Sequence, residues 1–338
     1  MELIVLKNKP RDILYCGVDK QKIMSAKPEL DLSALKTFAW LITERYKIHL
    51  RKDVEKKPAP WTKDSILQKY RFTNVRREHD TESKWLIKHI ALNKDLSYED
   101  KLMNCVLFRL FNKFPTSEII GQPIKFDSGY KPRDYFYIFN CIHKENPRYV
   151  FFSGAFITSG LKMALKKYIP RTDLKYDNAC MRMMYFMEYL RDTKFTEQVQ
   201  KCKTQKQVYE ILNSYDGLGG FLSYQIFVDF TYIPEFPFSE NEFVIAGPGC
   251  KYGMGYLFKK RDGLSYEECL FWLRDNWDEI VSCTSFDADK LFIDLPKWDR
   301  KMNIMSLENC FCEFGKYMKA KKGTGRPRLV YKHKEGIV

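Results

Sequence analysis

Apolar side chains recur at helical spacing in three long stretches of the chain. A repeat at positions i, i+3, i+4 and i+7 predicts a helix with one face in the core. The stretches contain Leu35, Phe38, Ile42 and Tyr46; Leu102, Val106, Leu110 and Phe114; and Met181, Met184, Met187 and Leu190. The two-residue alternation that is typical of strands is hard to find. We therefore predict a mainly α-helical fold, with roughly a dozen helices around a shared core.

Local signals predict where helices begin and where they are interrupted. Ser97 and Ser265 each precede an acidic residue by three positions, which is the spacing of a capping box at a helix N-terminus. The segment 51–60, RKDVEKKPAP, is charged and ends in prolines, so we expect a linker there. Residues 121–150 are rich in Pro, Gly and Tyr, and they predict a long irregular loop or a short hairpin.

The charge of the chain narrows the class of partner. Its 338 residues include 57 Lys and Arg against 43 Asp and Glu, and the net charge of +14 favours polyanionic partners. Aromatic residues make up 15% of the chain, which excludes a disordered or low-complexity protein. The opening residues lack the pattern of a signal peptide, and no apolar run is long enough to span a membrane. We expect a soluble, cytoplasmic protein with no membrane partner.

The cysteines lack the spacings of metal sites. None of the ten forms a CxxC pair, and the CFC at 310–312 has no second pair at zinc-ligand distance. We therefore expect reduced thiols, no metal and no cofactor. The segments GPGCKYG (247–253) and KKGTGRP (321–327) lack the GK[ST] ending of a phosphate-binding loop. The motifs of zinc proteases, zinc deaminases and α/β-hydrolases are also absent from the sequence.

A glycine-rich turn joins two apolar helical stretches within residues 208–232. Gly217, Gly219 and Gly220 would let backbone N–H groups at a helix N-terminus approach a phosphate closely. This arrangement resembles a helix-hairpin-helix motif, which binds DNA phosphates without reading the sequence. A glycine-rich corner that serves only helix packing explains the turn equally well.

The second helix of this hairpin resembles the base-pocket helix of helix-hairpin-helix DNA glycosylases. Gln225 and Asp229 occupy the positions that face a flipped base in that superfamily, and their spacing puts them on one helix face. A base edge would satisfy both side chains, and an internal hydrogen-bond network is the alternative. Phe221 stands where bifunctional members carry a Schiff-base lysine, which implies a monofunctional enzyme with Phe221 in the pocket. The catalytic carboxylate would be Asp229 or Glu242, whereas Glu240 fits a solvated loop charge better.

Four separated motifs resemble a narrower family. They are residues 60–86, FLSYQIFVDFTY (221–232), GPGCKYGMG (247–255) and CEFGKY (312–317). In this order, over residues 33–325, they are similar to the helical domain found with phage 5-hydroxymethyluracil DNA kinases. Proteins of thymine hypermodification, the pyrophosphorylases and amino-acid:DNA transferases, are related to that domain. Asn74, Arg77 and Asp80 match the family's first motif, which implies that Asn74 and Asp80 line a base pocket, whereas Arg76 replaces an expected aromatic residue.

Several basic residues are predicted to contact DNA. Arg76 and Arg77 would contact DNA phosphates from a helix that starts near Thr62. Lys251, just after the GPG turn, would contact a phosphate or a base substituent. A salt bridge from Arg76 to the acidic residue four positions later is the alternative. Arg326 lies in a GTGRPR segment that resembles the Gly-Arg-Pro core of minor-groove hooks, and a solvated basic tail is the other interpretation.

These features favour a helix-hairpin-helix DNA glycosylase-like fold with a basic C-terminal tail. We expect an N-terminal segment at 1–60, a helical domain at 61–312 and the tail at 313–338. The predicted activity is excision of a hypermodified pyrimidine, such as a glucosylated 5-hydroxymethyl base, from double-stranded phage DNA as antiviral defence. The alternatives are a hypermodification enzyme, either a transferase or a domain that supports a separate kinase, and a non-catalytic DNA-binding module. A separate kinase or a repair nuclease would be a further partner.

Overall fold

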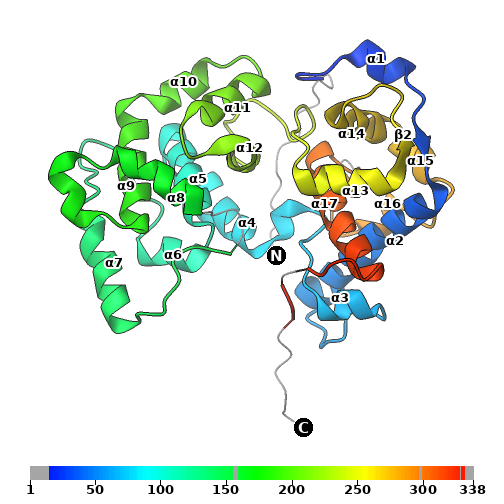
Figure 1. Ribbon diagram of the computed structural model, residues 1–338, viewed down its shortest axis with the longest axis horizontal. Coiled ribbons are helices and arrows are strands. Elements are labelled where there is room, and N and C mark those ends of the chain that lie inside the picture. The colour runs from blue at the N-terminus through cyan, green and yellow to red at the C-terminus, as the bar shows by residue number, and fades with distance from the viewer. Residues whose placement is uncertain (1–14, 155–158, 297–298, 328, 332–338) are drawn as a thin grey trace, which may run out of the picture. The chain divides into compact units, whose positions relative to one another are not determined.

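The computed structural model describes residues 15–154, 159–296, 299–327 and 329–331. They form two compact units (Figure 1). The first contains the continuous segment Thr81–Ser239, and the second contains the described parts of Ile13–Asp80 and Glu240–Val338. This division differs from the predicted boundaries after residues 60 and 312, because the second unit is assembled from two segments that are distant in the sequence.

The first unit is built from helices. Its α-helices are α4 (Thr81–Leu86), α5 (Tyr98–Phe111), α6 (Phe114–Ile119), α7 (Asp134–Glu145), α8 (Ser159–Ala164), α9 (Ala179–Asp192), α10 (Phe195–Lys201), α11 (Gln205–Ser214) and α12 (Gly219–Phe230). Shorter turns of other helix types are η3 (Ile87–Ala91), η4 (Leu165–Tyr168) and η5 (Arg171–Tyr176). Helix α12 packs against α5 and α11, so the predicted helical hairpin is a pair of contacting helices.

The second unit combines helices with one small sheet. Its α-helices are α1 (Lys20–Ser25), α2 (Leu32–His49), α3 (Ser65–Lys69), α13 (Pro248–Leu257), α14 (Tyr266–Asp275), α15 (Trp277–Val281), α16 (Ala288–Leu291) and α17 (Ile304–Lys321). Short turns are η1 (Leu50–Val54) and η2 (Arg77–His79). Strands β1 (Glu29–Leu30) and β2 (Phe258–Lys260) pair antiparallel. No helix among the described residues is long and apolar enough to cross a membrane.

The predicted mainly helical fold is confirmed, and the three apolar stripes explain much of it. They form the buried faces of α2, α5 and α9. Phe114 is the exception, because α5 ends at Phe111 and its C-cap Asn112 has a left-handed φ of 48°. Phe114 starts α6 instead. Both predicted caps are present. The Ser97 hydroxyl accepts the N–H of residue 100 at 3.0 Å, and the capping box at Ser265 is complete.

Two predicted irregular segments turn out to contain helical structure. The expected loop at 121–150 contains the helix α7, which begins just after Pro132, where a missing N–H costs nothing. The buried ring of Phe139 fixes α7 to the first unit. In the expected linker, residues 50–54 form η1, a continuation of α2.

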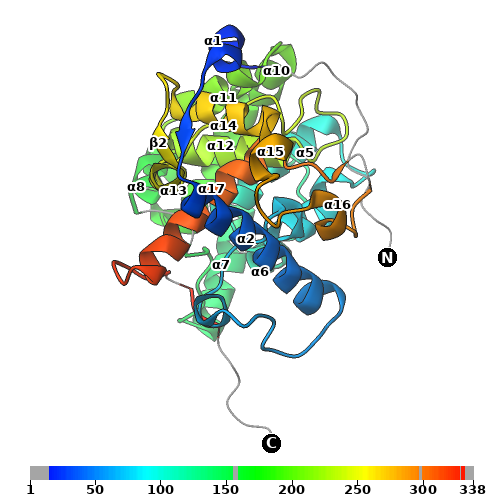
Figure 2. The ribbon, with the colours of Figure 1, turned by 90° about the vertical axis from the view of Figure 1, so that its right-hand side faces the viewer.

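Helices α13 and α17 cross at unusually close range (Figures 1 and 2). A Cβ placed on Gly253 would lie 2.0 Å from the carbonyl oxygen of Phe311 and 3.2 Å from the backbone nitrogen of Gly315. A Cβ on Gly249 would meet Cys312 Sγ at 3.2 Å. Gly249, Gly253 and Gly315 therefore bring the two backbones together, and this contact fixes the GPG loop onto α17.

Candidate functional site

Residues 70–80 of the first family motif contain no α-helix and are held against α17. A helix does begin near Thr62, but this helix, α3, ends at Lys69 and does not carry Arg76 and Arg77. The chain then runs extended to η2. Asn74 joins the two ends of residues 74–80 by hydrogen bonds. Its backbone N–H donates to Asp80 Oδ1 at 3.0 Å, and its side chain donates to the His79 carbonyl at 2.9 Å.

Two side chains anchor this segment from outside. The buried Arg45 donates from Nη2 to the carbonyl oxygens of Thr73 at 2.6 Å and Asn74 at 3.2 Å. Asn309 of α17 donates to the same Asn74 carbonyl at 3.0 Å. Arg45 is buried and Asn309 is partly buried, and these two donors supply the rigidity that a site requires.

A buried glutamate of α17 contacts the GPG loop. Gly247 precedes α13 as its N-cap, and Pro248 opens the helix. Glu308 accepts the N–H of Gly247 at 3.3 Å and the thiol of Cys312 at 3.4 Å. Because burial outweighs these two hydrogen bonds, the pKa of Glu308 rises from 4.5 to about 7. The spacing of the CEFGKY motif gave no hint of this residue, which lies one turn before it.

The first motif and α17 share one electrostatic cluster, which we call the carboxylate cluster: Asp80, Glu308, Glu313 and Arg77. Burial raises the pKa of Asp80 from 3.8 to about 6, against the hydrogen bond from Asn74 and the charge of Arg77. Arg77 also lowers the pKa of Glu308, and Glu313 raises both values. Glu313 itself is buried and pairs with Lys316 at 2.7 Å. Carboxyl groups that titrate near neutral pH can both donate and accept protons.

Arg76 is a structural residue rather than a phosphate ligand. Its side chain is 1% exposed, and it forms ion pairs with Glu78 at 2.7 Å and Asp299 at 2.6 Å. Its Nη1 donates to the carbonyl oxygens of Asp299 and Lys301. The predicted partner Asp80 is not used, because residues 76–80 do not form an α-helical turn. These protein acceptors leave no free face of the guanidinium for DNA, so the predicted phosphate contact of Arg76 is wrong.

The two candidate glutamates of the loop before α13 are both inside the second unit. Glu242 is 2% exposed. Glu240 accepts a hydrogen bond from the Asn303 side chain and lies 4.0 Å from Arg76 Nη2. Burial, followed by the charge of Glu78, raises the pKa of Glu240 to about 8. The interpretation of Glu240 as a solvated loop charge is therefore wrong, and a catalytic role for Glu242 stays a prediction.

Lys251 and Arg326 are exposed and stay candidates for phosphate contact. Lys251 lies in the first turn of α13, where its ammonium is 5.5 Å from the ring centre of Tyr266. Arg326 follows the C-terminus of α17. The predicted basic tail begins later than residue 313, because α17 continues to Lys321, and residues 328 and 332–338 lie outside the described residues.

In the first unit, the glycine turn between α11 and α12 has a packing role. Gly217 adopts a φ of 99°, and a Cβ there would lie 2.9 Å from Leu165 Cδ2. A Cβ on Gly220 would lie 2.8 Å from the hydroxyl oxygen of Tyr209. Gly219, with a φ of 59°, has open space around its Cβ position. The packing alternative therefore accounts for Gly217 and Gly220, and phosphate binding at this turn stays a prediction.

The polar pair of α12 is buried, and Asp229 has an internal partner. Asp229 is 0% exposed and accepts two hydrogen bonds from Arg109, at 2.7 and 2.6 Å. Arg109 also donates to Asn112 at 2.6 Å. Gln225 is 6% exposed, and Phe221 is 41% exposed. The hydrogen-bond network thus accounts for Asp229. Arg109 lies seven residues after Leu102, on the buried stripe of α5. An arginine at a buried position needs an acidic partner, and this signal in the sequence was overlooked.

The predicted site residues are divided between the two units. Gly217, Gly219, Gly220, Phe221, Gln225 and Asp229 belong to the first; Asn74, Arg76, Arg77, Asp80, Glu242, Lys251 and Arg326 belong to the second. The second unit brings Asn74, Arg77 and Asp80 together with Glu308 and Glu313, neither of which was predicted. A group that could hold a metal ion, His49, His79 and Asp294, also lies in the second unit.

Comparison with known proteins identifies the family. A sequence model of the family described as "5-hmdU DNA kinase, helical domain" matches residues 32–326. The "5-hmdU DNA kinase" of Bacillus phage SP10 is 24% identical over 290 residues, which cover 82% of this chain and 43% of that protein. The chain thus spans less than half the length of this curated relative. No solved structure is significantly similar to the chain.

These matches confirm one predicted resemblance and overturn the predicted activity. The similarity to the helical domain of 5-hydroxymethyluracil DNA kinases is confirmed. The prediction of a monofunctional DNA glycosylase is wrong, since the curated relative is a kinase, which transfers a group rather than hydrolysing a bond. The matches favour the alternative prediction, a protein of base hypermodification, over the predicted glycosylase. A relation to the helix-hairpin-helix superfamily stays a prediction.

Proposed function

Because the chain belongs to the family of the 5-hmdU DNA kinase helical domain, we propose that it acts on DNA that carries a base derived from 5-hydroxymethyluracil. We propose a transferase reaction rather than phosphorylation, since the sequence has no GK[ST] phosphate-binding loop. A separate kinase activity would first place a pyrophosphate on the hydroxymethyl oxygen. The chain would then exchange this group for an incoming amine.

The exchange requires one bond to break and one to form. The C–O bond between the methylene carbon of the base and the pyrophosphate breaks, and pyrophosphate leaves with the electron pair. The amine nitrogen bonds to the methylene carbon and loses a proton. Glu308 is suited to accept that proton, because a carboxyl group with a pKa of about 7 is partly ionised near neutral pH. Arg77 is the cation of the carboxylate cluster that is suited to bind the departing pyrophosphate.

The observation that carries this proposal is the location of the carboxylate cluster on the family's own motifs. Arg77 and Asp80 belong to the first motif, and Glu308 binds the backbone of the GPG loop through Gly247. Asp229 of the first unit is less suited to proton transfer, because Arg109 occupies both of its carboxylate oxygens. We therefore assign the reaction to the second unit, and DNA is the proposed partner.

The test uses duplex oligonucleotides that differ in one base. They carry thymine, 5-hydroxymethyluracil or the pyrophosphate ester of 5-hydroxymethyluracil, and each is incubated with the protein and an amine such as glycine. Only the pyrophosphate ester should react. Mass spectrometry of the nucleosides from the digested DNA should then show a new amine adduct, and free pyrophosphate should appear. Abasic sites, or binding to the ester without any chemical change, would contradict the proposal.

A pair of variants connects this activity to the carboxylate cluster. Glu308→Gln keeps the size of the side chain and removes the proton acceptor, so we expect a fall in kcat of about 100-fold or more. Asp289→Asn is the matched control, because Asp289 is an 80% exposed carboxylate of the same unit. Full activity of folded Glu308→Gln would exclude Glu308 as the acceptor.

A further inference from the structure

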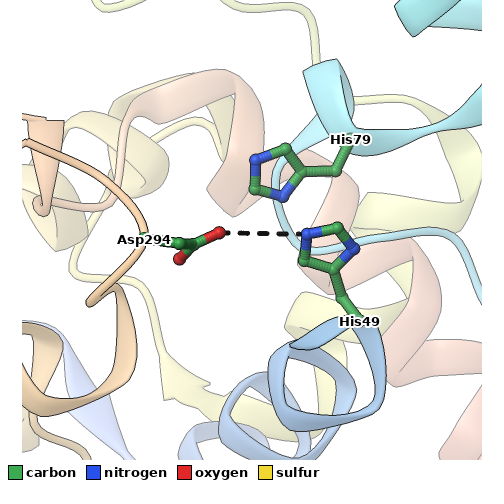
Figure 3. Close-up of side chains that lie close together, drawn as sticks. All are labelled: His49, His79 and Asp294. Carbon is green, nitrogen blue, oxygen red and sulfur yellow. Dashed lines mark ion pairs between the residues drawn. The ribbon is translucent and has the colours of Figure 1, made fainter. Parts of the chain in front are cut away.

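Two histidines and one aspartate converge in the second unit. His49 is the last residue of α2, His79 is the last residue of η2, and Asp294 follows α16. One ligand atom from each side chain lies within 4.8 Å of the other two. Figure 3 shows the two imidazole rings and the carboxylate pointing toward one another from three separate segments of the chain. None of the three residues was a predicted site residue, because the ligands are far apart in the sequence.

Neighbouring side chains orient two of these ligands. His49 is 3% exposed, and its Nδ1 lies 3.0 Å from Asp53 Oδ2, while its Nε2 faces Asp294 Oδ2 at 4.0 Å. A carboxylate on one ring nitrogen places the proton there and leaves a lone pair on the other, which is the arrangement of metal-bound histidines. Tyr46 donates its hydroxyl to Asp294 Oδ1 at 2.5 Å, which leaves Oδ2 directed at His49.

The third ligand has a buried nitrogen with no partner. His79 Nδ1 makes no hydrogen bond to any described residue, although it is shielded from solvent. The ring stacks on His49, with centroids 4.2 Å apart and an interplanar angle of 18°. A buried polar atom without a partner is costly, so a group bound to this nitrogen would stabilise the fold.

We propose that His49 Nε2, His79 Nδ1 and Asp294 Oδ2 bind one divalent transition-metal ion of the zinc type. Two imidazoles and one carboxylate are a common ligand set for zinc, with the fourth position left for water. Imidazole nitrogens select against magnesium and calcium, which prefer oxygen ligands. Zinc bonds of about 2.0–2.1 Å place neighbouring ligand atoms roughly 3.4 Å apart in a tetrahedral site. The two imidazole rings are stacked with an interplanar angle of 18°, so one ring must turn about its Cβ–Cγ bond for both nitrogen lone pairs to point at one ion.

The ion would cross-link three segments, of which α2 and the loop after α16 are already joined by the hydrogen bond from Tyr46 to Asp294. It would tie the end of α2 to the loop after α16 and to η2. The residue after His79 is Asp80, so the ion would also hold the part of the first family motif that Asn74 and Asp80 join. This role is one of positioning, and the binding itself does not depend on the proposed transferase activity.

The test measures metal binding directly on the full chain. Protein freed of metal with a chelator is titrated with Co²⁺, whose visible absorption reports coordination by protein ligands, and the bound Co²⁺ is then displaced by Zn²⁺. We expect one ion per chain and a higher melting temperature of the loaded protein. His79→Ala should weaken binding at least tenfold, and Asp53→Asn, which removes only the orienting carboxylate, should weaken it by about 10- to 100-fold.

His143→Ala is the matched control, since His143 is an exposed histidine of α7. Circular dichroism checks that each variant is folded. If His79→Ala does not fold, Asp53→Asn still tests the site, because it keeps all three ligands. Wild-type protein that takes up no Co²⁺, or unchanged affinity in both folded variants, overturns the proposal. Loss of binding in His143→Ala alone would place the ion elsewhere and would overturn it as well.

Discussion

Glu308 makes the stability of the protein depend on pH. Its pKa in the folded state, about 7, lies above its ordinary value of 4.5, so the folded protein binds the proton more tightly than the unfolded chain. The stabilisation from Glu308 is fully present below pH 4.5 and is lost as the pH rises through 7, by an amount on the order of 3 kcal/mol.

We therefore predict that Glu308→Gln, which stays neutral, unfolds at higher urea concentration than the wild type at pH 8. The difference should shrink toward pH 4.5. Urea titrations at several pH values measure it, with Glu279→Gln as the control, because Glu279 is exposed on α15. A variant that keeps the pH dependence of the wild type would show that other groups cause it.

The ion pair between Arg109 and Asp229 leads to a second prediction at this scale. Asp229→Asn would leave a guanidinium that is 4% exposed without its counter-charge. We expect a loss of about 3–5 kcal/mol in the free energy of unfolding, which denaturant titration can measure. The control is Glu210→Gln, in an exposed pair with Lys206, which should change stability by less than about 0.5 kcal/mol. Wild-type stability of Asp229→Asn would mean that Arg109 finds another acceptor.

Among the elements, the crossing of α13 and α17 is the most sensitive to side-chain size. Gly253→Ala would place a methyl group 2.0 Å from a backbone carbonyl oxygen of α17, so one helix must move. We predict a loss of about 3 kcal/mol, measured by thermal or urea unfolding.

Gly255→Ala is a control on the same helix, since nothing lies within 4 Å of its Cβ position. It should leave stability unchanged or raise it by up to about 1 kcal/mol, because alanine is the better helix former. If both variants lost stability equally, the cause would be a property of α13 itself rather than its contact with α17.

The elements differ in how far the sequence could predict them. The stripes of α2, α5 and α9 and the caps at Ser97 and Ser265 were predictable because they depend on neighbours within one or two turns. Helix α7 was missed because prolines and glycines before it suggested a loop for the whole stretch.

The candidate site was predictable only in part. Asn74, Arg77 and Asp80 were found through the first motif, but their environment depends on α17, more than 200 residues later in the chain. Glu308 lies outside the recognised motif, and only folding brings it to Gly247. The burial of Arg76 and Asp229 likewise depends on distant partners, which local spacing does not reveal.

For the whole molecule, the net charge of +14 predicts that binding to DNA weakens steeply with salt. Fluorescence anisotropy at several salt concentrations should give a straight line of log K against log salt. Lys251→Ala and Arg326→Ala should each reduce the magnitude of this slope by about one, because each variant removes one phosphate contact. Lys290→Ala is the control, because Lys290 is paired with Asp287. An affinity that does not change with salt would exclude phosphate contacts as the main source of binding.

The order in which the two units can fold follows from the path of the chain. Arg76 Nη2 lies 4.0 Å from Glu240 Oε1, so the points where the chain leaves and re-enters the second unit are close together within it. Arg45 reaches Cys310 Sγ at 3.5 Å, and residues 45 and 310 are 265 positions apart. On the ribosome, residues 15–80 emerge before Thr81–Ser239 but lack their partners until α17 is made. The segment Thr81–Ser239 can pack as soon as it emerges, so the unit encoded in the middle of the chain should become protease-resistant first.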